Sequence, residues 1–439
     1  MIDNNQYNKW LFKELGEVST IKSGGTPSRA IKEYWNGDIP WVKISDISKE
    51  YVDKTDEFIT VEGLKNSSTN IFPKGTILFT IFATIGKVGI LDIDATTNQA
   101  IAGITPNSEI VNSKFLTYSL RELALSLENQ GKGVAQKNIN LSILKSTKIP
   151  LPPLPEQKRI VAKLDSIFSH LELAKQGLVK IPVLLKQFRQ AVLTQGVTGK
   201  LTEQWRNGKE LEDWTSVSSS KIFEFITSGS RGWAQYYDNS GDQLFVRITN
   251  MNYGTFKLDL RPEKLQFLKL ANTTEGKRTL LKSRDILISI TADVGMISLV
   301  EGDFKYEGYV NQHVCLARPI KAINEKFLVY FLMSENGFGQ FKKMKRGATK
   351  SGLTLGDIKK LNIEFPPLIE QAEIVSHIEV LLTKADAIEA QYKKLKEQID
   401  QLPQAILAKA FKGDLAEQKQ SDGLSETSLK NIKALKAEL

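Results

Sequence analysis

The chain has 439 residues, several times the size of a usual domain, so we expect more than one domain. Hydrophobic residues make up 41% of the chain and charged residues 25%, a globular composition that argues against global disorder. The formal net charge of +9 permits a polyanionic partner without proving one.

Cysteine and histidine usage excludes two further classes of protein. Cys315 is the single cysteine, which rules out a disulfide framework and a thiolate zinc cage. The three histidines are far apart and lack metal-ligand spacing, so we expect no metal site. Residues 1–6 lack a signal-peptide core, and glycine and lysine interrupt the most apolar stretch, residues 76–91. We therefore expect a reduced, cytoplasmic protein.

The first predicted element, residues 1–151, is a mixed α/β domain. β-branched runs such as residues 77–82 alternate with turn signals, which is typical of short strands. Residues 113–128 have the pattern of a helix.

The second element, residues 152–205, is predicted to be a long helix. It begins at Pro152-Pro153-Leu154-Pro155-Glu156-Gln157 and ends near Gly199, as expected from the preferences of proline and glycine at helix ends. Steps of four and three residues give an apolar line with the 3.5-residue period of a coiled-coil seam. The seam residues of this helix are Ile160, Leu164, Ile167, Leu171, Leu178 and Leu185. Pro182 should kink or interrupt the helix.

Both elements then recur. Residues 206–365 echo the first domain at an offset that drifts from 204 to 214, so about ten net residues were inserted in loops of the second copy. Residues 366–415 repeat the helix at a constant offset of 214, from Pro366-Pro367-Leu368-Ile369-Glu370-Gln371 to Gly413. Pro403 lies inside and should also kink or interrupt its helix. The seam residues of the second helix are Ile374, Ile378, Leu381, Ile388, Leu395 and Ile399. Residues 416–439 form a polar tail.

The simplest partner for one long helix is the other. Antiparallel pairing would relate the two halves by a pseudo-two-fold axis. Residues 160–192 would span about 48 Å at 1.5 Å per residue, so the pair would act as a spacer between the globular domains. The alternative is two unrelated helices, each packed on its own domain.

Signatures of catalysis are absent from the sequence. It contains no phosphate-binding loop ending in Gly-Lys-Ser/Thr, no dinucleotide-type glycine fingerprint and no Gly-x-Ser-x-Gly elbow. The chain is therefore expected to bind rather than to catalyse.

This order of elements resembles the specificity subunit of type I restriction–modification systems. Further likenesses are Leu15-Gly16-Glu17-Val18, Lys22-Ser23-Gly24-Gly25-Thr26-Pro27-Ser28, and the helix ends Gln190-Ala191-Val192-Leu193 and Gln404-Ala405-Ile406-Leu407. The resemblance covers residues 8–415. It implies two mixed α/β target-recognition domains, separated by two antiparallel coiled-coil helices, that each read one half of a split DNA site.

The resemblance also implies partners and cofactors. The helices would dock two methyltransferase subunits, which bind S-adenosylmethionine and methylate adenine at N6. Restriction subunits that use ATP and Mg²⁺ would add cleavage. This chain itself would bind no cofactor and would not be an enzyme alone.

Candidate DNA contacts are cations, amides and hydroxyls, which bind phosphates and base edges. In the first domain they are Lys22, Gly25, Thr26, Ser28, Arg29, Lys43, Lys87, Asn98, Gln99, Lys132 and Lys137. In the second they are Arg231, Arg247, Asn311, Gln312, Lys342, Lys343, Lys345, Arg346 and Lys350.

Each of these candidates has an ordinary structural alternative. Asn98-Gln99 and Asn311-Gln312 recur at matching places and could instead cap a turn. Gly24-Gly25-Thr26 could be a tight turn, Lys43 and Arg247 the solvent face of a strand, and residues 342–350 a solvated charged face. His313 is expected to be packed or hydrogen-bonded.

Two other functions stay open at this point. The chain could be a coiled-coil scaffold whose globular domains bind proteins rather than DNA. It could also be a nuclease without recognisable motifs. Divergent loops on two matched domains favour DNA reading, because two different half-sites need two different readers.

Overall fold

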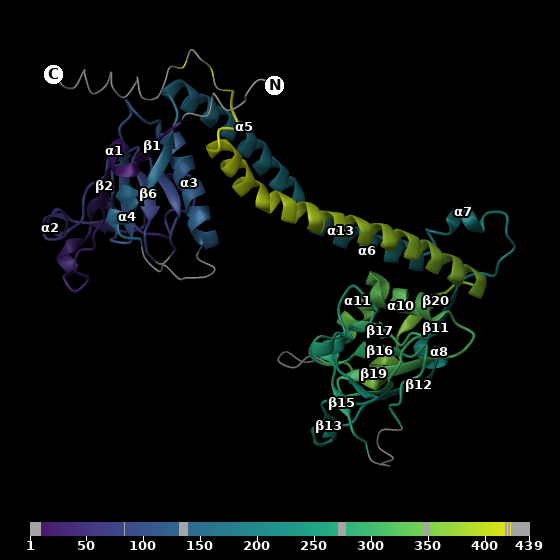
Figure 1. Ribbon diagram of the computed structural model, residues 1–439. Coiled ribbons are helices and arrows are strands. Elements are labelled where there is room, and N and C mark those ends of the chain that lie inside the picture. Colours follow the sequence, from purple (N-terminus) through teal and green to yellow (C-terminus); the bar gives the residue numbers. More distant parts are fainter. Residues whose placement is uncertain are drawn as a thin grey trace, which may run out of the picture. The chain divides into compact units, whose positions relative to one another are not determined.

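The computed structural model describes residues 10–82, 84–130, 139–270, 278–345, 352–417, 419 and 422, and the statements below concern these residues. The chain forms two compact units (Figure 1). Unit 1 comprises Met1–Leu178 and Lys394–Leu439, and unit 2 comprises Val179–Lys393.

The globular part of unit 1 is a mixed α/β domain. A five-stranded sheet has the order β2-β9-β6-β7-β4, a three-stranded sheet has the order β5-β3-β8, and β1 pairs with β10. The strands are β1 (Leu11–Glu14), β2 (Ser19–Ser23), β3 (Trp35–Val42), β4 (Tyr51–Val52), β5 (Phe58–Ile59), β6 (Ile77–Thr80), β7 (Val88–Leu91), β8 (Thr96–Thr97), β9 (Ile101–Pro106) and β10 (Lys148–Leu151). The helices are α1 (Leu15–Val18), α2 (Val61–Lys65), α3 (Ser113–Gln130) and α4 (Leu141–Ser146).

Strand β6 is buried on both of its faces. Ile77 and Phe79 pack with Phe115 of α3, whereas Leu78 belongs to a second core with Val42. This division follows from the two-residue period of a strand. It explains why the sequence of β6 is a continuous apolar run.

The globular part of unit 2 repeats this plan. Its sheets have the orders β12-β19-β16-β17 and β13-β15-β14-β18, and β11 pairs with β20. The strands are β11 (Thr215–Ser218), β12 (Phe223–Ser228), β13 (Tyr237–Asp238), β14 (Gln243–Val246), β15 (Phe267–Leu268), β16 (Ile286–Ser289), β17 (Ile297–Leu299), β18 (Glu307–Val310), β19 (Val314–Pro319) and β20 (Asn362–Phe365). The helices are α7 (Glu203–Arg206), α8 (Ser219–Ile222), α10 (Glu325–Met333), α11 (Glu335–Met344) and α12 (Leu355–Ile358). The prediction of two mixed α/β domains is confirmed.

Three long helices lie outside the globular domains. They are α5 (Leu154–Val179), α6 (Ile181–Val197) and α13 (Leu368–Phe411). The first long helix is interrupted between α5 and α6, where Pro182 stands in the first turn of α6, as predicted. Helix α13, in contrast, is one continuous helix through Pro403, so the predicted interruption at this proline does not occur. Gly199 and Gly413, at φ +76° and +87°, follow the helix ends in the left-handed conformation that glycine adopts without strain.

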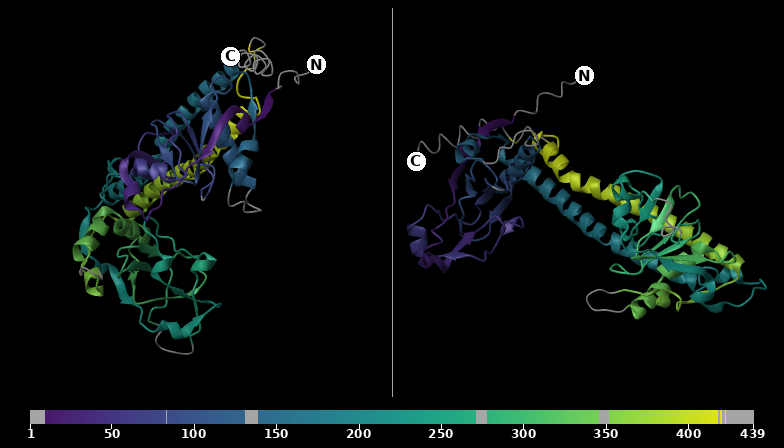
Figure 2. Two further views of the ribbon diagram at one scale, coloured as in Figure 1. Left: turned by 90° about the vertical axis from the view of Figure 1, so that its left-hand side faces the viewer. Right: turned by 90° about the horizontal axis from the view of Figure 1, so that it is seen from below.

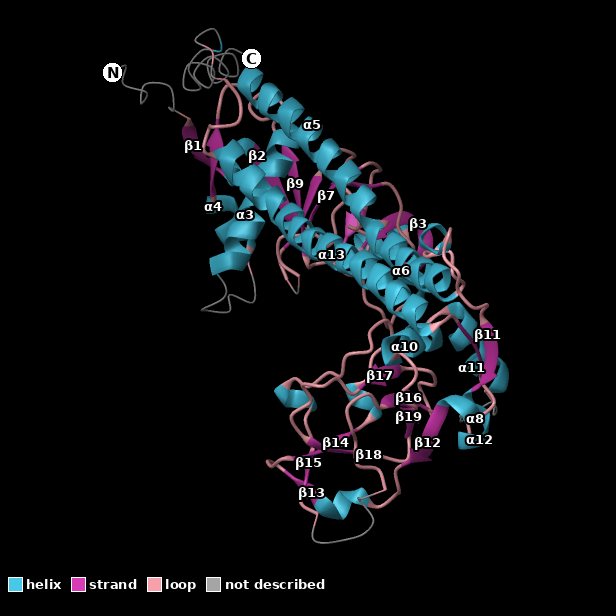
Figure 3. Cartoon of the chain, turned by 90° about the vertical axis from the view of Figure 1, so that its right-hand side faces the viewer, coloured by secondary structure: helices cyan, strands magenta, loops and turns pink. Residues whose placement is uncertain are grey.

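The helices pair antiparallel within each unit. In unit 1, Ile160 and Leu164 near the start of α5 share a core with Leu407 near the end of α13. In unit 2, Val197 at the end of α6 shares a core with Ile374 near the start of α13. Figure 2 shows α5 beside the last part of α13, and Figure 3 shows α6 beside its first part, with α10 next to α6. The antiparallel arrangement was predicted.

Most residues of the predicted seam are buried. The buried members are Ile160, Leu164, Leu171, Leu178, Leu185, Ile374, Ile378 and Ile399. Ile167 and Leu381 are half-buried. Ile388 and Leu395 differ from the prediction, because their side chains are 50% and 46% exposed. The heptad pattern marks two apolar lines, and on this stretch of α13 the buried line is the one through Ala385 and Ile399.

Candidate nucleic-acid interface

The turn after β2 in the first domain is held close to the strand that precedes β9. The N–H of Gly24 donates to Ile101 O and the N–H of Gly25 to Thr97 O, both at 2.9 Å. A Cβ atom on Gly24 would lie 2.1 Å from Thr97 Oγ1, so only glycine fits. The Gly25 amide is thus engaged inside the domain and is not free to bind a phosphate.

The recurring asparagines shape equivalent turns in the two domains. Asn98 Oδ1 accepts the N–H of Ala100 at 3.1 Å, and Asn311 Oδ1 accepts the N–H of His313 at 3.0 Å. The N–H of Gly229 donates to Asn311 O in the second domain, and the N–H of Gly24 donates to Ile101 O at the corresponding turn of the first domain. Both asparagines therefore have the turn-capping role.

The glutamines after these asparagines have different neighbours in the two domains. Gln99 is exposed and contacts the Thr26 hydroxyl. Gln312 Nε2 lies 2.9 Å from His313 Nε2, while His313 Nδ1 bonds the Thr291 hydroxyl. Because an amide NH₂ group only donates, His313 Nε2 accepts and its Nδ1–H donates. The same turn thus carries an amide and a hydroxyl in one domain and an amide–imidazole–hydroxyl chain in the other.

Two candidate cations of the first domain share one carboxylate. Lys43 Nζ lies 2.8 Å from Glu57 Oε1, and Arg29 lies 2.5 Å from Glu57 Oε2. The Lys43 hydrogen bond, followed by that of Arg29, lowers the pKa of Glu57 despite its partial burial. The Arg29 guanidinium also stacks on Trp35, 3.6 Å from the ring centroid. Trp35 and Glu57 were not predicted, because they come from separate segments and have no repeated pattern.

The other candidate cations differ in how free they are. Lys22, Arg231, Lys343 and Lys345 are exposed, as is Ser28. Lys87 Nζ donates to Ile44 O at 2.9 Å, and Lys342 lies over the Phe338 ring at 4.7 Å. Lys132, Lys137, Arg346 and Lys350 lie outside the described residues.

Lys43 and Arg247 do not share one environment, although their sequence positions match. Arg247 Nη2 donates to Lys264 O at 3.3 Å, and its backbone N–H donates to Asn250 Oδ1. Lys43 instead pairs with Glu57. The two cations therefore have different partners within their own domains.

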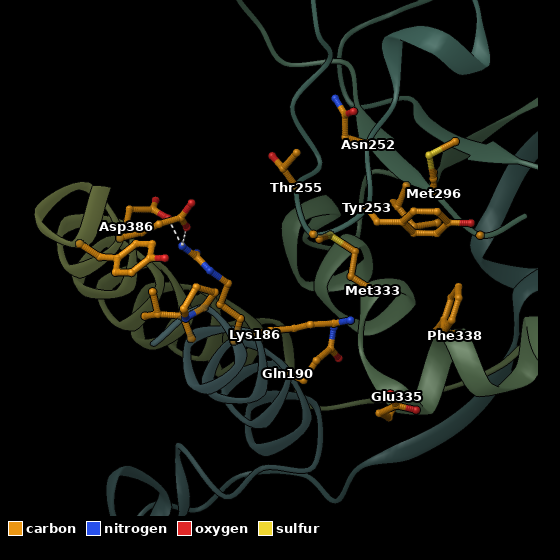
Figure 4. A pocket seen from close by; sticks show the side chains of 18 of the residues that line it. Lys186, Gln190, Asn252, Tyr253, Thr255, Met296, Met333, Glu335, Phe338 and Asp386 are labelled. Atoms are coloured by element: carbon orange, nitrogen blue, oxygen red, sulfur yellow. Dashed lines mark hydrogen bonds and ion pairs between the residues drawn. The ribbon is translucent and has the colours of Figure 1, made fainter. Parts of the chain in front are cut away.

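A cavity of about 910 Å³ lies within unit 2, between its long helices and its globular domain. Figure 4 shows helix residues such as Gln190 and Asp386 on one side and Tyr253 and Phe338 on the other. On the helix side Arg189 is paired with both Asp386 and Glu389, at 2.7 and 2.9 Å. These three charges are thus paired with each other across α6 and α13.

Two other kinds of site are missing from the part of the chain that the structure describes. No group of three His, Cys, Asp or Glu residues there could hold a metal ion. No helix among the described residues is long and apolar enough to cross a membrane.

Residues 7–182 and 211–399 match the family of the type I restriction modification DNA specificity domain. The chain is 28% identical over 439 residues to the specificity subunit of the type I restriction enzyme EcoBI of Escherichia coli, covering 94% of this chain and 87% of the relative. It is 27% identical over 442 residues to the StySPI specificity subunit of Salmonella potsdam, covering 97% and 93%.

Solved structures show the same fold. The HsdS subunit from Thermoanaerobacter tengcongensis matches with a TM-score of 0.64 at 21% identity, covering 94% of this chain and all of that one. A chain from a study of complex assembly and conformational transition in the type I R-M system matches with a TM-score of 0.67 at 21% identity, covering 92% and 98%.

Proposed function

The chain belongs to the type I restriction–modification DNA specificity family, and from this premise we propose that each of its globular domains reads one half of a bipartite DNA target. The long helices set the spacing of the half-sites and dock two methyltransferase subunits. Those subunits bind S-adenosylmethionine and methylate adenine N6, and through them restriction subunits bring ATP- and Mg²⁺-dependent cleavage. The chain itself is non-catalytic and acts on double-stranded DNA in the cytoplasm.

One observation carries this proposal: the two domains share a framework but differ in the side chains at matched turns. Asn98 and Asn311 make the same turn. Beside them, Thr26 accompanies Gln99 and His313 accompanies Gln312. Different donors and acceptors on the same scaffold suit two half-sites of different sequence, because base pairs differ in the groups on their major-groove edges.

The surface of the long helices supports docking of protein partners. Large apolar side chains are exposed there, including Val179 and Val183 in unit 2 and Leu173 in unit 1. Exposed apolar side chains that gather on one element mark interaction surfaces. Because the helix sequence occurs twice, two copies of one partner are expected.

The proposal is tested by co-expressing the chain with candidate methyltransferase partners and mapping methylated adenines across a genome. We expect one two-part site with a constant gap. Gln99→Ala should relax base preference in one half only, and Gln312→Ala in the other half only. Gln187→Ala, an exposed amide on α6, serves as the matched control and should change neither half. Methylation at a single continuous site, or both variants altering the same half, would contradict the proposal.

The exposed apolar side chains also favour the second candidate, a scaffold that binds only proteins. Binding of random duplex DNA, measured across salt concentrations, separates the two. Steep weakening with salt is expected for a DNA reader, because bound phosphates release counterions. A scaffold of the second kind would show no binding at any salt concentration.

A further inference from the structure

Each long helix begins with a glutamate–glutamine pair that is almost completely buried. Glu156 and Gln157 open α5, and Glu370 and Gln371 open α13; none is more than 4% exposed. Polar side chains at such depth are costly unless their hydrogen bonds are made. Their partners therefore show what these residues do.

Two side-chain bonds of these glutamines recur in the two units, and Gln157 Nε2 also donates to Ile110 O at 3.2 Å. Oε1 accepts the backbone N–H of Asn112 (2.7 Å) or Asn324 (3.0 Å). Nε2 donates to the carbonyl of the first proline of the motif, Pro152 (2.8 Å) or Pro366 (2.9 Å). Each asparagine in turn caps the domain helix that follows it, since Asn112 Oδ1 accepts Phe115 N–H and Asn324 Oδ1 accepts Phe327 N–H. The glutamine thus ties the first turn of a globular-domain helix to the first turn of a long helix.

A second attachment lies further along each long helix. Lys114 of α3 pairs with Asp165 of α5 at 2.8 Å, and Lys326 of α10 pairs with Glu379 of α13 at 2.6 Å. In both units the acid stands eight residues after the glutamine, about 12 Å along the helix axis. Two separated attachments fix an angle, whereas one would leave a pivot.

The buried glutamates hold a third part of each domain. Trp10 Nε1 donates to Glu156 at 3.0 Å, and Trp214 Nε1 donates to Glu370 at 3.1 Å. These tryptophans directly precede β1 and β11, so the first strand of each domain is tied to the helix start. In unit 2, Arg206 also pairs with Glu370.

We propose that Gln157 and Gln371 are positioning residues that fix the angle between each globular domain and its long helix, and thereby the number of unspecified base pairs between the half-sites. The inference rests on the proposed function. A domain of about 140 residues has a radius of gyration of about 14 Å, so its far surface lies on the order of 30 Å from the helix start. A tilt of about 7° moves that surface by about 3.4 Å, one base-pair step.

The cavity in unit 2 leaves room for the globular domain to tilt. About 910 Å³ is unfilled between the helices and the loop that carries Tyr253. Close packing therefore does not oppose a tilt on that side of the domain. Without the glutamine bonds, the Trp214–Glu370 bond and the Lys326–Glu379 ion pair still hold the domain on the helix, so we expect a small change of angle toward the cavity rather than unfolding.

The test uses the full chain in complex with its methyltransferase partner and DNA substrates whose half-sites are constant but whose gap varies. The variants are Gln157→Met and Gln371→Met, which keep side-chain length but remove every hydrogen bond of the amide. Lys158→Met and Ala372→Met, at the neighbouring exposed positions, are matched controls. We expect the two glutamine variants to recognise the same half-site bases as wild type. Their methylation rate on DNA whose gap is one base pair shorter or longer should be within about tenfold of the rate on the preferred gap. The controls should keep the wild-type gap.

A conservative variant separates positioning from general loss of structure. In Gln371→Glu, burial raises the pKa of the new carboxyl. The neutral carboxyl can still accept the N–H of Asn324 and donate to the carbonyl of Pro366. We therefore compare the gap selectivity of the variant with that of wild type at each pH, and expect it to be closer to wild type at pH 6 than at pH 8.5. If Gln371→Met does not fold, this pH comparison decides alone.

The outcomes distinguish the two proposals. Wild-type gap selectivity in folded methionine variants, or in Gln371→Glu at both pH values, would overturn this inference alone. A wild-type complex that methylates no two-part site would overturn the proposed function, and this inference with it.

Discussion

Replacing two leucines of the predicted seam by aspartate should give very different losses of stability. Leu171 is 9% exposed and Leu395 is 46% exposed, although the heptad pattern treats them alike, and both lie in unit 1. Leu171→Asp loses most of the transfer free energy of a buried leucine, about 1.5–3 kcal/mol, and places a polar group without a partner in an apolar layer, about 1–3 kcal/mol more. Leu395→Asp loses about half the transfer term, about 1 kcal/mol, and its carboxylate stays in water.

Thermal unfolding followed by circular dichroism at 222 nm measures the difference. At about 2–4 °C per kcal/mol for a unit of this size, we expect Leu171→Asp to lower the Tm by about 6–20 °C and Leu395→Asp by about 2–4 °C. Leu171→Asn and Leu395→Asn control for the charge, because they keep the shape of aspartate. Equal losses at the two positions, or a larger loss at Leu395, would refute the assignment of the covered line.

Three further outcomes are expected. Insertion of four residues beside Gly177 in α5 lengthens the helix by about 6 Å. Methylation mapping should then show unchanged half-site bases and a gap wider by one or two base pairs. Altered half-site bases with an unchanged gap would contradict the spacer role of the helices. Burial raises the pKa of the Cys315 thiol to about 12, so a thiol reagent at pH 8 should label it only after unfolding, and fast native labelling would be inconsistent with this site. The Glu57 carboxyl has a lowered pKa in the folded protein. Its ion pairs therefore stabilise the fold above about pH 4.3, and this stabilisation is lost as the pH falls below that value. The free energy of unfolding, measured with urea, should change less between pH 6 and pH 3.5 for Glu57→Gln than for wild type.

The sequence predicts those features that depend on local pattern. Paired prolines and closing glycines indicated where α5 and α13 begin and where the helices end, and an apolar run indicated β6. Local pattern does not tell which of two apolar lines a partner helix covers, which is why Ile388 and Leu395 were placed in the seam.

Contacts between distant segments are the second part that the sequence does not reveal. The Glu-Gln motif is visible in the sequence, but Gln157 bonds Asn112, which lies 45 residues earlier. Similarly, Arg29, Trp35 and Glu57 meet in space without any repeat in the second domain to mark them. For the candidate DNA contacts, residue type identified surface cations but not which of them, like Lys87, already has a partner inside the domain.

The pairing of β1 with β10, and of β11 with β20, has a consequence for the evolution of these domains. Leu11 stands opposite Leu151, and Thr215 opposite Phe365, in antiparallel ladders. The chain therefore enters and leaves each globular domain through neighbouring strands about 5 Å apart. Any domain whose ends share this spacing can replace the resident one as a cassette, by recombination at two short DNA segments. Under the proposed function, such an exchange would give a new target specificity in one step, while the sequences of the long helices stay unaltered.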